Sequence, residues 1–118
     1  MAETEFAATG SFELHVEQRA VMQMAAPGVE GYVLGRTDAA SSYMPDVNLA
    51  DFRALEHGVS RRHAALVRYR GRVHIVDLSS VNGTFLNGER LQPDKPYPLR
   101  PGDILRLGTL NMSLIKIK

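Results

Sequence analysis

Hydrophobic and polar side chains alternate with a period of two along most of this chain, which is typical of half-buried β-strands. Pairs of turn-forming residues separate the alternating segments about every ten residues, and no segment shows a sustained helical period. The sequence therefore predicts an all-β sandwich. The segments that carry the pattern are residues 12–16, 20–24, 31–36, 65–70, 73–78, 84–86, 89–91, 104–107 and 110–117.

Two predicted hairpins are marked by their turn residues. Gly71 separates 65–70 from 73–78, and Asn87-Gly88 separates 84–86 from 89–91. Asn-Gly favours a tight hairpin because both residues tolerate a positive φ. In the last segment the apolar phase shifts between Leu114 and Ile115, which indicates a bulge or a strand buried on both faces.

Two stretches lack the alternating pattern. Residues 1–10 are small and polar, which predicts a flexible tail and leaves residues 11–118 as the folded domain. Residues 37–59 predict a long connection with at most one helical turn, between Leu49 and Leu55. A connection of this length in a small domain is often functional.

The composition fits one globular domain of 118 residues, with 44% hydrophobic and 23% charged residues. No apolar run is long enough for a membrane helix, and the acidic N-terminus does not resemble a secretory signal. The absence of Cys excludes disulfides and thiolate metal sites. These features favour a cytoplasmic protein with no role at a membrane.

The formal net charge is only +1, but basic residues are unevenly distributed. Residues 53–72 contain six Arg and one Glu, whereas residues 1–30 contain five Glu and one Arg. Of the 14 basic residues, 11 are Arg, whose planar fork suits carboxylates and phosphates. The basic segment therefore suggests an anionic partner.

Three predicted loops carry the residues that could hold a phosphate group. Such a site needs a guanidinium fork, a hydroxyl donor and backbone N–H groups. Arg36 can supply the fork, Ser60 the hydroxyl and Arg61 a second charge. Asn82 has both a donor and an acceptor, so its side chain can pair with the main chain of an extended peptide.

These residues also resemble a family signature. The order and spacing of Gly35-Arg36, Ser60-x-x-His63, Ser80-x-Asn82-Gly83-Thr84 and Asn87-Gly88 are similar to those of the forkhead-associated (FHA) domain, over residues 32–118. The resemblance implies a sandwich of two twisted sheets with about eleven short strands. It also implies that loops at one end bind phosphothreonine peptides, with no catalytic residue, metal or cofactor.

The resemblance assigns roles to the matching positions. Arg36 and Ser60 would hold the phosphate, Arg61 would contact the phosphate or the adjacent peptide, and Asn82 would bind the peptide main chain. A small pocket near Asn82 would take the threonine γ-methyl group. Residues that would support the site are Gly35, His63, Gly83, Thr84 and Asn87.

One position departs from the family pattern. Val81 lies where many members have a Ser or Thr that also contacts the phosphate. A hydrogen bond to a charged group contributes about 1.5–3 kcal/mol, so its loss predicts binding weakened by about tenfold or more. The backbone N–H of Val81 and the neighbouring Ser80 are counted with the phosphopeptide-binding residues because they could replace that contact.

The partner implied is a protein phosphorylated by a Ser/Thr kinase, either the kinase itself or its substrate. If phosphorylated, Thr4 or Thr9 on a flexible tail could also reach the site and block it. An FHA-fold interaction domain without phosphate dependence remains a second reading, with Val81 as its motivation.

Two further classes fit less well. The Arg-rich segment 61–72 could bind nucleic acid, but Tyr69 is its only aromatic residue and the net charge is low. Ser60, His63 and Asp77 supply the residue types of a hydrolase triad. The segment around Ser60 lacks the second glycine of a nucleophile elbow, and the four His lack metal-site spacing.

Overall fold

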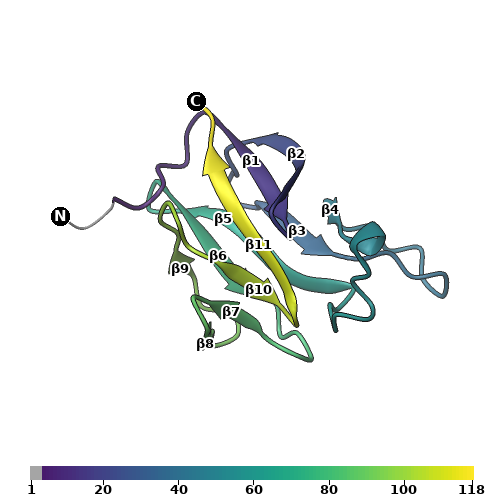
Figure 1. Ribbon diagram of the computed structural model, residues 1–118. Coiled ribbons are helices and arrows are strands. Elements are labelled where there is room, and N and C mark those ends of the chain that lie inside the picture. Colours follow the sequence, from purple (N-terminus) through teal and green to yellow (C-terminus); the bar gives the residue numbers. More distant parts are fainter. Residues whose placement is uncertain (1–3) are drawn as a thin grey trace.

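The computed structural model describes residues 4–118, which form two β-sheets packed face to face (Figure 1). Within these residues, the six-stranded sheet has the order β2-β1-β11-β10-β7-β8 and the five-stranded sheet the order β4-β3-β5-β6-β9. Among residues 4–118, no helix is long and apolar enough to cross a membrane. The elements are β1 (Ser11–Val16), β2 (Arg19–Ala25), β3 (Tyr32–Gly35), β4 (Val47–Asn48), the 3-10 helix η1 (Ala50–Phe52), β5 (Arg62–Tyr69), β6 (Arg72–Asp77), β7 (Thr84–Leu86), β8 (Glu89–Arg90), β9 (Tyr97–Pro98), β10 (Leu105–Leu107) and β11 (Leu110–Lys116).

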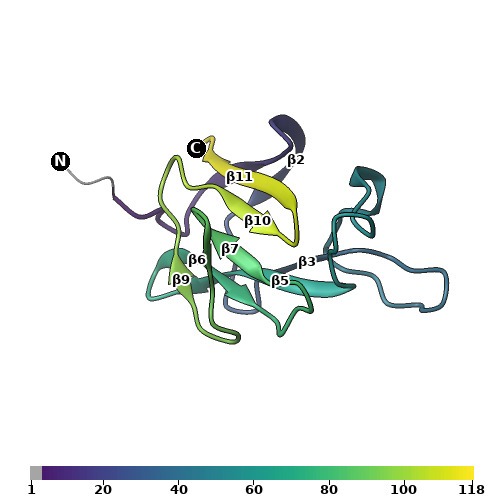
Figure 2. The same cartoon turned by 60° about the horizontal axis from the view of Figure 1, so that its bottom comes forward.

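Figure 2 shows the two layers from the edge of the sandwich. They enclose one hydrophobic core. In β1, β10 and most of β11 alternate side chains point inward and are buried. β5 and β6 instead bury runs of consecutive residues. The all-β sandwich predicted by the alternating pattern is therefore confirmed. Fully buried core residues include Phe12, Leu14, Leu34, Leu66, Ile75, Leu105, Leu107 and Leu110.

Both predicted hairpins are confirmed. β5 and β6 are joined by Arg70 and Gly71, with φ of 53° and 75°, and β7 and β8 by Asn87 and Gly88, with φ of 51° and 87°. A turn with two positive φ values matches the right-handed twist of the strands it joins. The first turn places a non-glycine residue, Arg70, in this conformation.

The irregularity expected near Leu114 is absent. Pairing between β1 and β11 runs without a break from Phe12↔Lys116 to Val16↔Met112. Ile115 is 47% exposed, so the strand is not buried on both faces either. Both alternatives were wrong because the shift in pattern comes from Ile115 and Ile117, which are both exposed.

The expectation of a flexible tail over residues 1–10 is wrong for the part that the structure describes. Phe6 is buried, and its ring lies edge-on to Phe12 with the centroids 5.4 Å apart. The Phe6 N–H donates to the Leu99 carbonyl, and its carbonyl accepts from the Val73 N–H, each at 2.9 Å. Residues 1–3 lie outside the described residues.

This anchoring also removes the idea that a phosphorylated Thr9 folds back onto the loops. Lys116 Nζ donates to the Thr9 carbonyl at 2.9 Å, at the end of β11. The other end of β11, Leu110, borders the candidate loops. Seven strand residues span about 20 Å, so Thr9 is held at the far end of the sandwich.

The long connection 37–59 has more structure than the sequence predicts. It contains β4 and η1, and it buries Val47, Leu49, Ala54 and Val59 in the core. The expected helical turn is confirmed as η1, although Leu55 is 65% exposed. The segment between β3 and β4 projects beyond the sheets, on the right of Figure 1.

Four connections meet at one end of the sandwich, which we call the loop end. Strand register brings them together, because Gly35 pairs with Arg62 and Leu107 pairs with Thr84. The connections are residues 36–46, 53–61, 78–83 and 108–109. The opposite end, which we call the hairpin end, carries the β5–β6 turn and the N-terminal segment.

Candidate functional site

Arg36 follows β3 and is held by the connection between η1 and β5. Its backbone N–H donates to the Arg61 carbonyl at 3.1 Å, and its Nε donates to the Val59 carbonyl at 2.7 Å. A Cβ on Gly35 would lie 1.9 Å from the Arg61 carbonyl oxygen, so only glycine allows this approach. The guanidinium is therefore fixed while most of its five N–H donors stay free of backbone partners.

An acidic side chain already lies against this arginine. Arg36 Nη1 donates to Asp38 Oδ2 at 3.3 Å, and the Ala40 N–H donates to Asp38 Oδ1 at 2.8 Å. The Ala40 N–H and then the Arg36 guanidinium lower the pKa of the Asp38 carboxyl. An anion that binds Arg36 must therefore share the guanidinium with an ionised carboxylate.

Ser60 has a free hydroxyl proton. Its Oγ accepts a hydrogen bond from the Val81 N–H at 3.2 Å, and its own N–H donates to His63 Nδ1 at 2.9 Å. The hydroxyl is thus oriented by the neighbouring loop and can donate to an oxyanion. The Val81 N–H, considered as a replacement donor, is engaged with Ser60, and the Val81 side chain is 81% exposed.

His63 joins two of the loops from beneath. It is fully buried and occupies the irregular step between β3 and β5, where Leu34 pairs with Ala64 and Gly35 with Arg62. Its Nδ1 accepts from Ser60, so Nε2 carries the proton and donates to the Gly83 carbonyl at 3.0 Å. Burial lowers the pKa of His63, which favours this neutral ring.

The connection after β6 is built on a buried carboxylate. Asp77 Oδ1 accepts from Ser80 Oγ at 2.6 Å and from Thr84 Oγ1 at 2.7 Å. Ser80 Oγ in turn accepts from the Gly83 N–H at 3.0 Å. Ser80 was grouped with the ligand contacts, but its hydroxyl lies within the loop's own hydrogen bonding, as that of Thr84 does.

Asn82 lies at the surface with part of its amide uncommitted. Its Nδ2 donates to the Gly58 carbonyl at 2.9 Å, and a Cβ on Gly58 would lie 2.6 Å from this nitrogen. Gly58 also has φ of 79°, so both its backbone conformation and the close approach of Asn82 favour glycine at this position. One amide N–H and Oδ1 remain for a ligand's main chain.

The predicted residues thus separate into three groups. Arg36, Ser60, Arg61, Val81 and Asn82 meet at the loop end. The supporting groups of His63, Gly83, Thr84 and Ser80 lie directly beneath them. Asn87 is elsewhere: it bonds Asp103 and the Ile104 N–H, each at 2.9 Å, and so positions the start of β10.

Comparison with known proteins decides the family. The model of the FHA domain matches residues 32–108, which include three connections of the loop end in full and the first residue of the fourth. The chain belongs to the FHA domain family. FHA domains are protein-interaction modules, known for binding phosphothreonine.

Its relatives among curated proteins are longer. This FHA domain is 45% identical over 67 residues to the probable E3 ubiquitin-protein ligase dma1 of Schizosaccharomyces pombe, which is 53% of this chain and 24% of the relative. It is 38% identical over 98 residues to the E3 ubiquitin-protein ligase DMA2 of Saccharomyces cerevisiae, which is 75% of this chain and 18% of the relative. The chain thus spans a quarter or less of these relatives.

Solved structures share the fold. One comes from a structural and functional analysis of phosphothreonine-dependent FHA domain interactions. It aligns with a TM-score of 0.66 and 26% identity, over 92% of this chain and 98% of that one. The eleven-stranded architecture that the sequence resemblance implied is therefore confirmed.

Ser60, His63 and Asp77 are not arranged as a hydrolase triad in this FHA domain. Both nitrogens of His63 bond backbone groups, and the Asp77 carboxylate bonds Ser80 and Thr84. Ser60, His63 and Asp77 therefore form no relay. In residues 4–118 no three His, Cys, Asp or Glu side chains cluster as metal ligands would.

The Arg-rich segment is divided between the two ends of this FHA domain. Arg61 lies at the loop end, whereas Arg68, Arg70 and Arg72 lie at the hairpin end. The eight residues of β5 separate them by about 26 Å. The nucleic-acid alternative expected Arg68, Arg70 and Arg72 to form a patch at one turn. The β5–β6 hairpin forms that turn, but the patch lies apart from Arg61.

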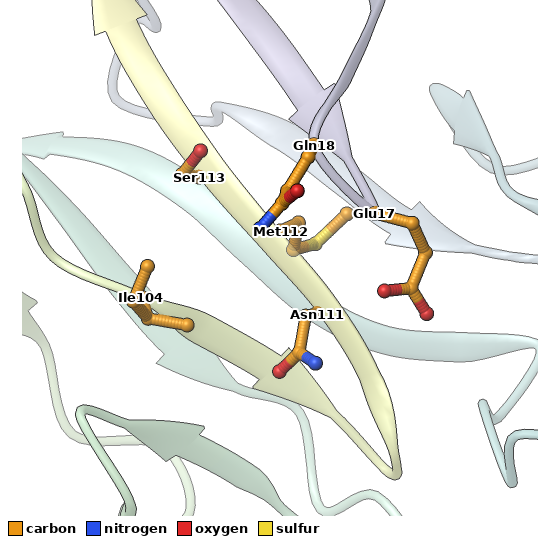
Figure 3. A pocket seen from close by; sticks show the side chains of 6 residues that line it. All are labelled: Glu17, Gln18, Ile104, Asn111, Met112 and Ser113. Carbon is orange, nitrogen blue, oxygen red and sulfur yellow. The ribbon is translucent and has the colours of Figure 1, made fainter.

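A hollow of about 340 Å³ lies beside β11 on the outer face of the six-stranded sheet (Figure 3). It has no Lys, Arg or His in its lining, so it offers no cation to a phosphate. This hollow is therefore not an alternative to the loop end as a phosphate site. The lining residues are Glu17, Gln18, Ile104, Asn111, Met112 and Ser113.

Asp77 and Gly58 also support the candidate site, although the sequence does not predict them there. Asp77 is the last residue of β6 and is only 2% exposed, which is unusual for a carboxylate. A carboxylate at the end of a buried strand is a usable signal, because it needs hydrogen-bond donors nearby. Gly58 carried no such signal, because only the fold shows how close Asn82 comes to it.

Proposed function

We propose that this FHA domain binds proteins phosphorylated on threonine by a Ser/Thr kinase, through the loop end. The supporting observation is a set of uncommitted donors on one braced surface: the Arg36 guanidinium, the Ser60 hydroxyl and the Asn82 amide. A phosphate dianion accepts such charge-assisted bonds strongly. Arg61, which is exposed beside them, adds positive charge.

The rest of the site would read the residue that carries the phosphate. Asn82 would bind the peptide main chain, and the threonine γ-methyl group would pack between Asn82 and the exposed side chain of Val81. This apolar contact would favour phosphothreonine over phosphoserine. The domain would act as a signalling adaptor in the cytoplasm, with a kinase or its substrate as partner and no chemical step of its own.

Fluorescence anisotropy with an oriented phosphothreonine peptide library tests this proposal. Matched phosphoserine and unphosphorylated pools serve as controls. We expect micromolar binding to the phosphothreonine pool, and at least about 50-fold weaker binding for Arg36→Ala, because charge-assisted bonds to the phosphate are lost. Arg70→Ala, which removes the same charge at the hairpin end, should bind as the wild type does.

Other outcomes identify the alternatives. Equal binding to unphosphorylated peptide would mean an FHA-fold interaction without phosphate dependence. Binding only to nucleic acid, weakened steeply by salt, would overturn the proposal in favour of a basic surface. Absence of binding in every pool would mean that Asp38 and Val81 together remove the phosphate affinity.

A further inference from the structure

Another hollow, at the loop end, begins beside the residues of the proposed phosphate site. It has a volume of about 410 Å³, and Asn82 and Gly58 form the border between the two. Asn82 follows Val81, whose N–H bonds Ser60 Oγ. A main chain that pairs with Asn82 therefore passes from the phosphate-binding residues into this hollow. The lining residues are Glu56, His57, Gly58, Asn82, Phe85, Arg106, Gly108 and Thr109.

The hollow contains a cation that the fold leaves without a counter-ion. Arg106 is central in β10, where its partners are Phe85 on β7 and Asn111 on β11. The guanidinium lies 4.1 Å from the centroid of the Phe85 ring, so its plane is held by stacking. Its Nε is buried and has no hydrogen-bond partner in residues 4–118, and none of the ion pairs among these residues includes Arg106.

A buried charged donor without an acceptor is unfavourable. A ligand that brings an oxyanion into the hollow would compensate the charge of Arg106 and gain a charge-assisted bond from a preordered fork. Such a ligand group must be short enough to enter a hollow of this size and must be attached to the chain that Asn82 binds. The side chains of Asp and Glu meet both conditions.

We infer, resting on the proposed function, that Arg106 selects ligands with an acidic residue at a fixed spacing from the phosphothreonine. The domain would then recognise two anionic groups on one chain: the phosphate at Arg36 and Ser60, and a carboxylate at Arg106. Sites of phosphorylation that lack the acidic residue would bind more weakly. The specificity would therefore come from β10 as well as from the loops.

One acidic side chain on the rim opposes this preference. Glu56 lines the same hollow, but its Oε2 accepts from Arg53 Nε at 3.3 Å and it is widely exposed to water. Its charge is therefore partly compensated and well solvated. Glu56→Gln should strengthen the preference for an acidic residue, which provides a variant with the opposite sign from Arg106→Gln.

The test uses phosphothreonine peptides with a neutral background, in which one Glu is moved through the four positions on each side of the phosphothreonine. Each is matched by a peptide with Gln at that position. We expect one position, on one side only, to bind about tenfold more tightly as Glu than as Gln. In Arg106→Gln this ratio should fall to about one, while the affinity for the Gln peptide is kept. In Arg106→Lys part of the ratio should remain.

Arg68→Gln is the matched control, because it removes one exposed positive charge at the hairpin end. It should keep the tenfold ratio, and thermal unfolding should show that every variant is folded. If the wild type prefers Glu at no position, or if Arg106→Gln keeps the preference, the inference is wrong while phosphothreonine binding stands. If no phosphopeptide binds, the proposed function itself fails. A further peptide with phosphoserine at the selected position shows whether a second phosphate can replace the carboxylate.

Discussion

Each end of the sandwich contains a buried histidine and a group of arginines, but they are connected differently. At the loop end, His63 accepts from the Ser60 N–H and donates to the Gly83 carbonyl, 20 residues away in the chain. At the hairpin end, the one side-chain hydrogen bond of His74 within residues 4–118 is to the Arg72 carbonyl, two residues away, and its ring packs against Tyr69. The first histidine joins separate loops, whereas the second remains within one hairpin.

The arginines differ in the same way. Arg36 is 15% exposed and bonded to the backbone of another connection, whereas Arg70 is exposed and lies over the ring of its neighbour Tyr69. Holding a long side chain still has an entropy cost that the fold has already met for Arg36. The loop end therefore differs from the hairpin end in the attachment of its arginine to a braced backbone, and not in the number of its arginines.

The largest difference should come from the two histidines. His63→Ala removes two hydrogen bonds and leaves a cavity beneath the loops, so we expect a loss of about 3 kcal/mol in the free energy of unfolding. His74→Ala should cost about 1–2 kcal/mol, because only one local bond is lost. Urea unfolding gives both values. Phosphopeptide affinity should fall in His63→Ala alone, and equal losses in the two variants would contradict the comparison.

The arginines come next. Arg36→Lys keeps the charge but loses the fork and the Nε bond to Val59, and we expect phosphothreonine peptide to bind about 10- to 30-fold more weakly. Arg70→Lys should change the affinity less than twofold. Isothermal titration calorimetry measures both. An Arg36→Lys variant with wild-type affinity would mean that a point charge suffices and that the fixed orientation of the guanidinium is not used.

Val81 allows a gain of function. Val81→Thr adds a hydroxyl beside Ser60 with little change in volume, and we expect about tenfold tighter binding of phosphothreonine peptide from one charge-assisted bond. The matched control is Val29→Thr, another valine that is 70% exposed, next to Gly28, whose carbonyl bonds Arg68. Competition anisotropy compares the two. An unchanged affinity in Val81→Thr would show that the added hydroxyl points away from the ligand.

Features that follow from local patterns could be predicted from the sequence. Alternation and turn residues located the strands, since burial on one face imposes a period of two and positive φ restricts the turn. Phe6 was missed because one buried aromatic residue in a small, polar segment has no period. Arg36, Ser60, Asn82 and His63 were predicted from their spacing in the motif, and the fold brings them together at the loop end.

Other features of the loop end could not be predicted from any pattern in the sequence. Asp38 looks like any loop carboxylate until its distance to Arg36 is known. Arg106 looks like an ordinary polar residue of an alternating strand, and only the buried Nε and the Phe85 ring distinguish it. Contacts between residues far apart in sequence depend on register and loop path, which local patterns do not specify.

The smallest expected effect is a pH dependence from His63. Burial lowers its pKa below the ordinary value of 6.5, so the unfolded chain takes up this proton at a higher pH than the folded domain does. Stability is then complete above that value and falls as the pH drops below it, by at most about 1.4 kcal/mol per pH unit for one proton. Protonated Nδ1 would also become a donor facing the Ser60 N–H, so acid would loosen the loop end first.

Urea unfolding of the wild type and His63→Gln at pH 7.5, 6.5 and 5.5 separates this contribution from others. We expect the wild type to lose stability through this range and the variant to lose less. The pKa of the Asp38 carboxyl is lowered, so its contribution is lost only at pH values below about 4, outside the range. Should His63→Gln keep the wild-type slope, the proton would be taken up elsewhere, and the contrast between a braced loop end and a local hairpin end would rest on geometry alone.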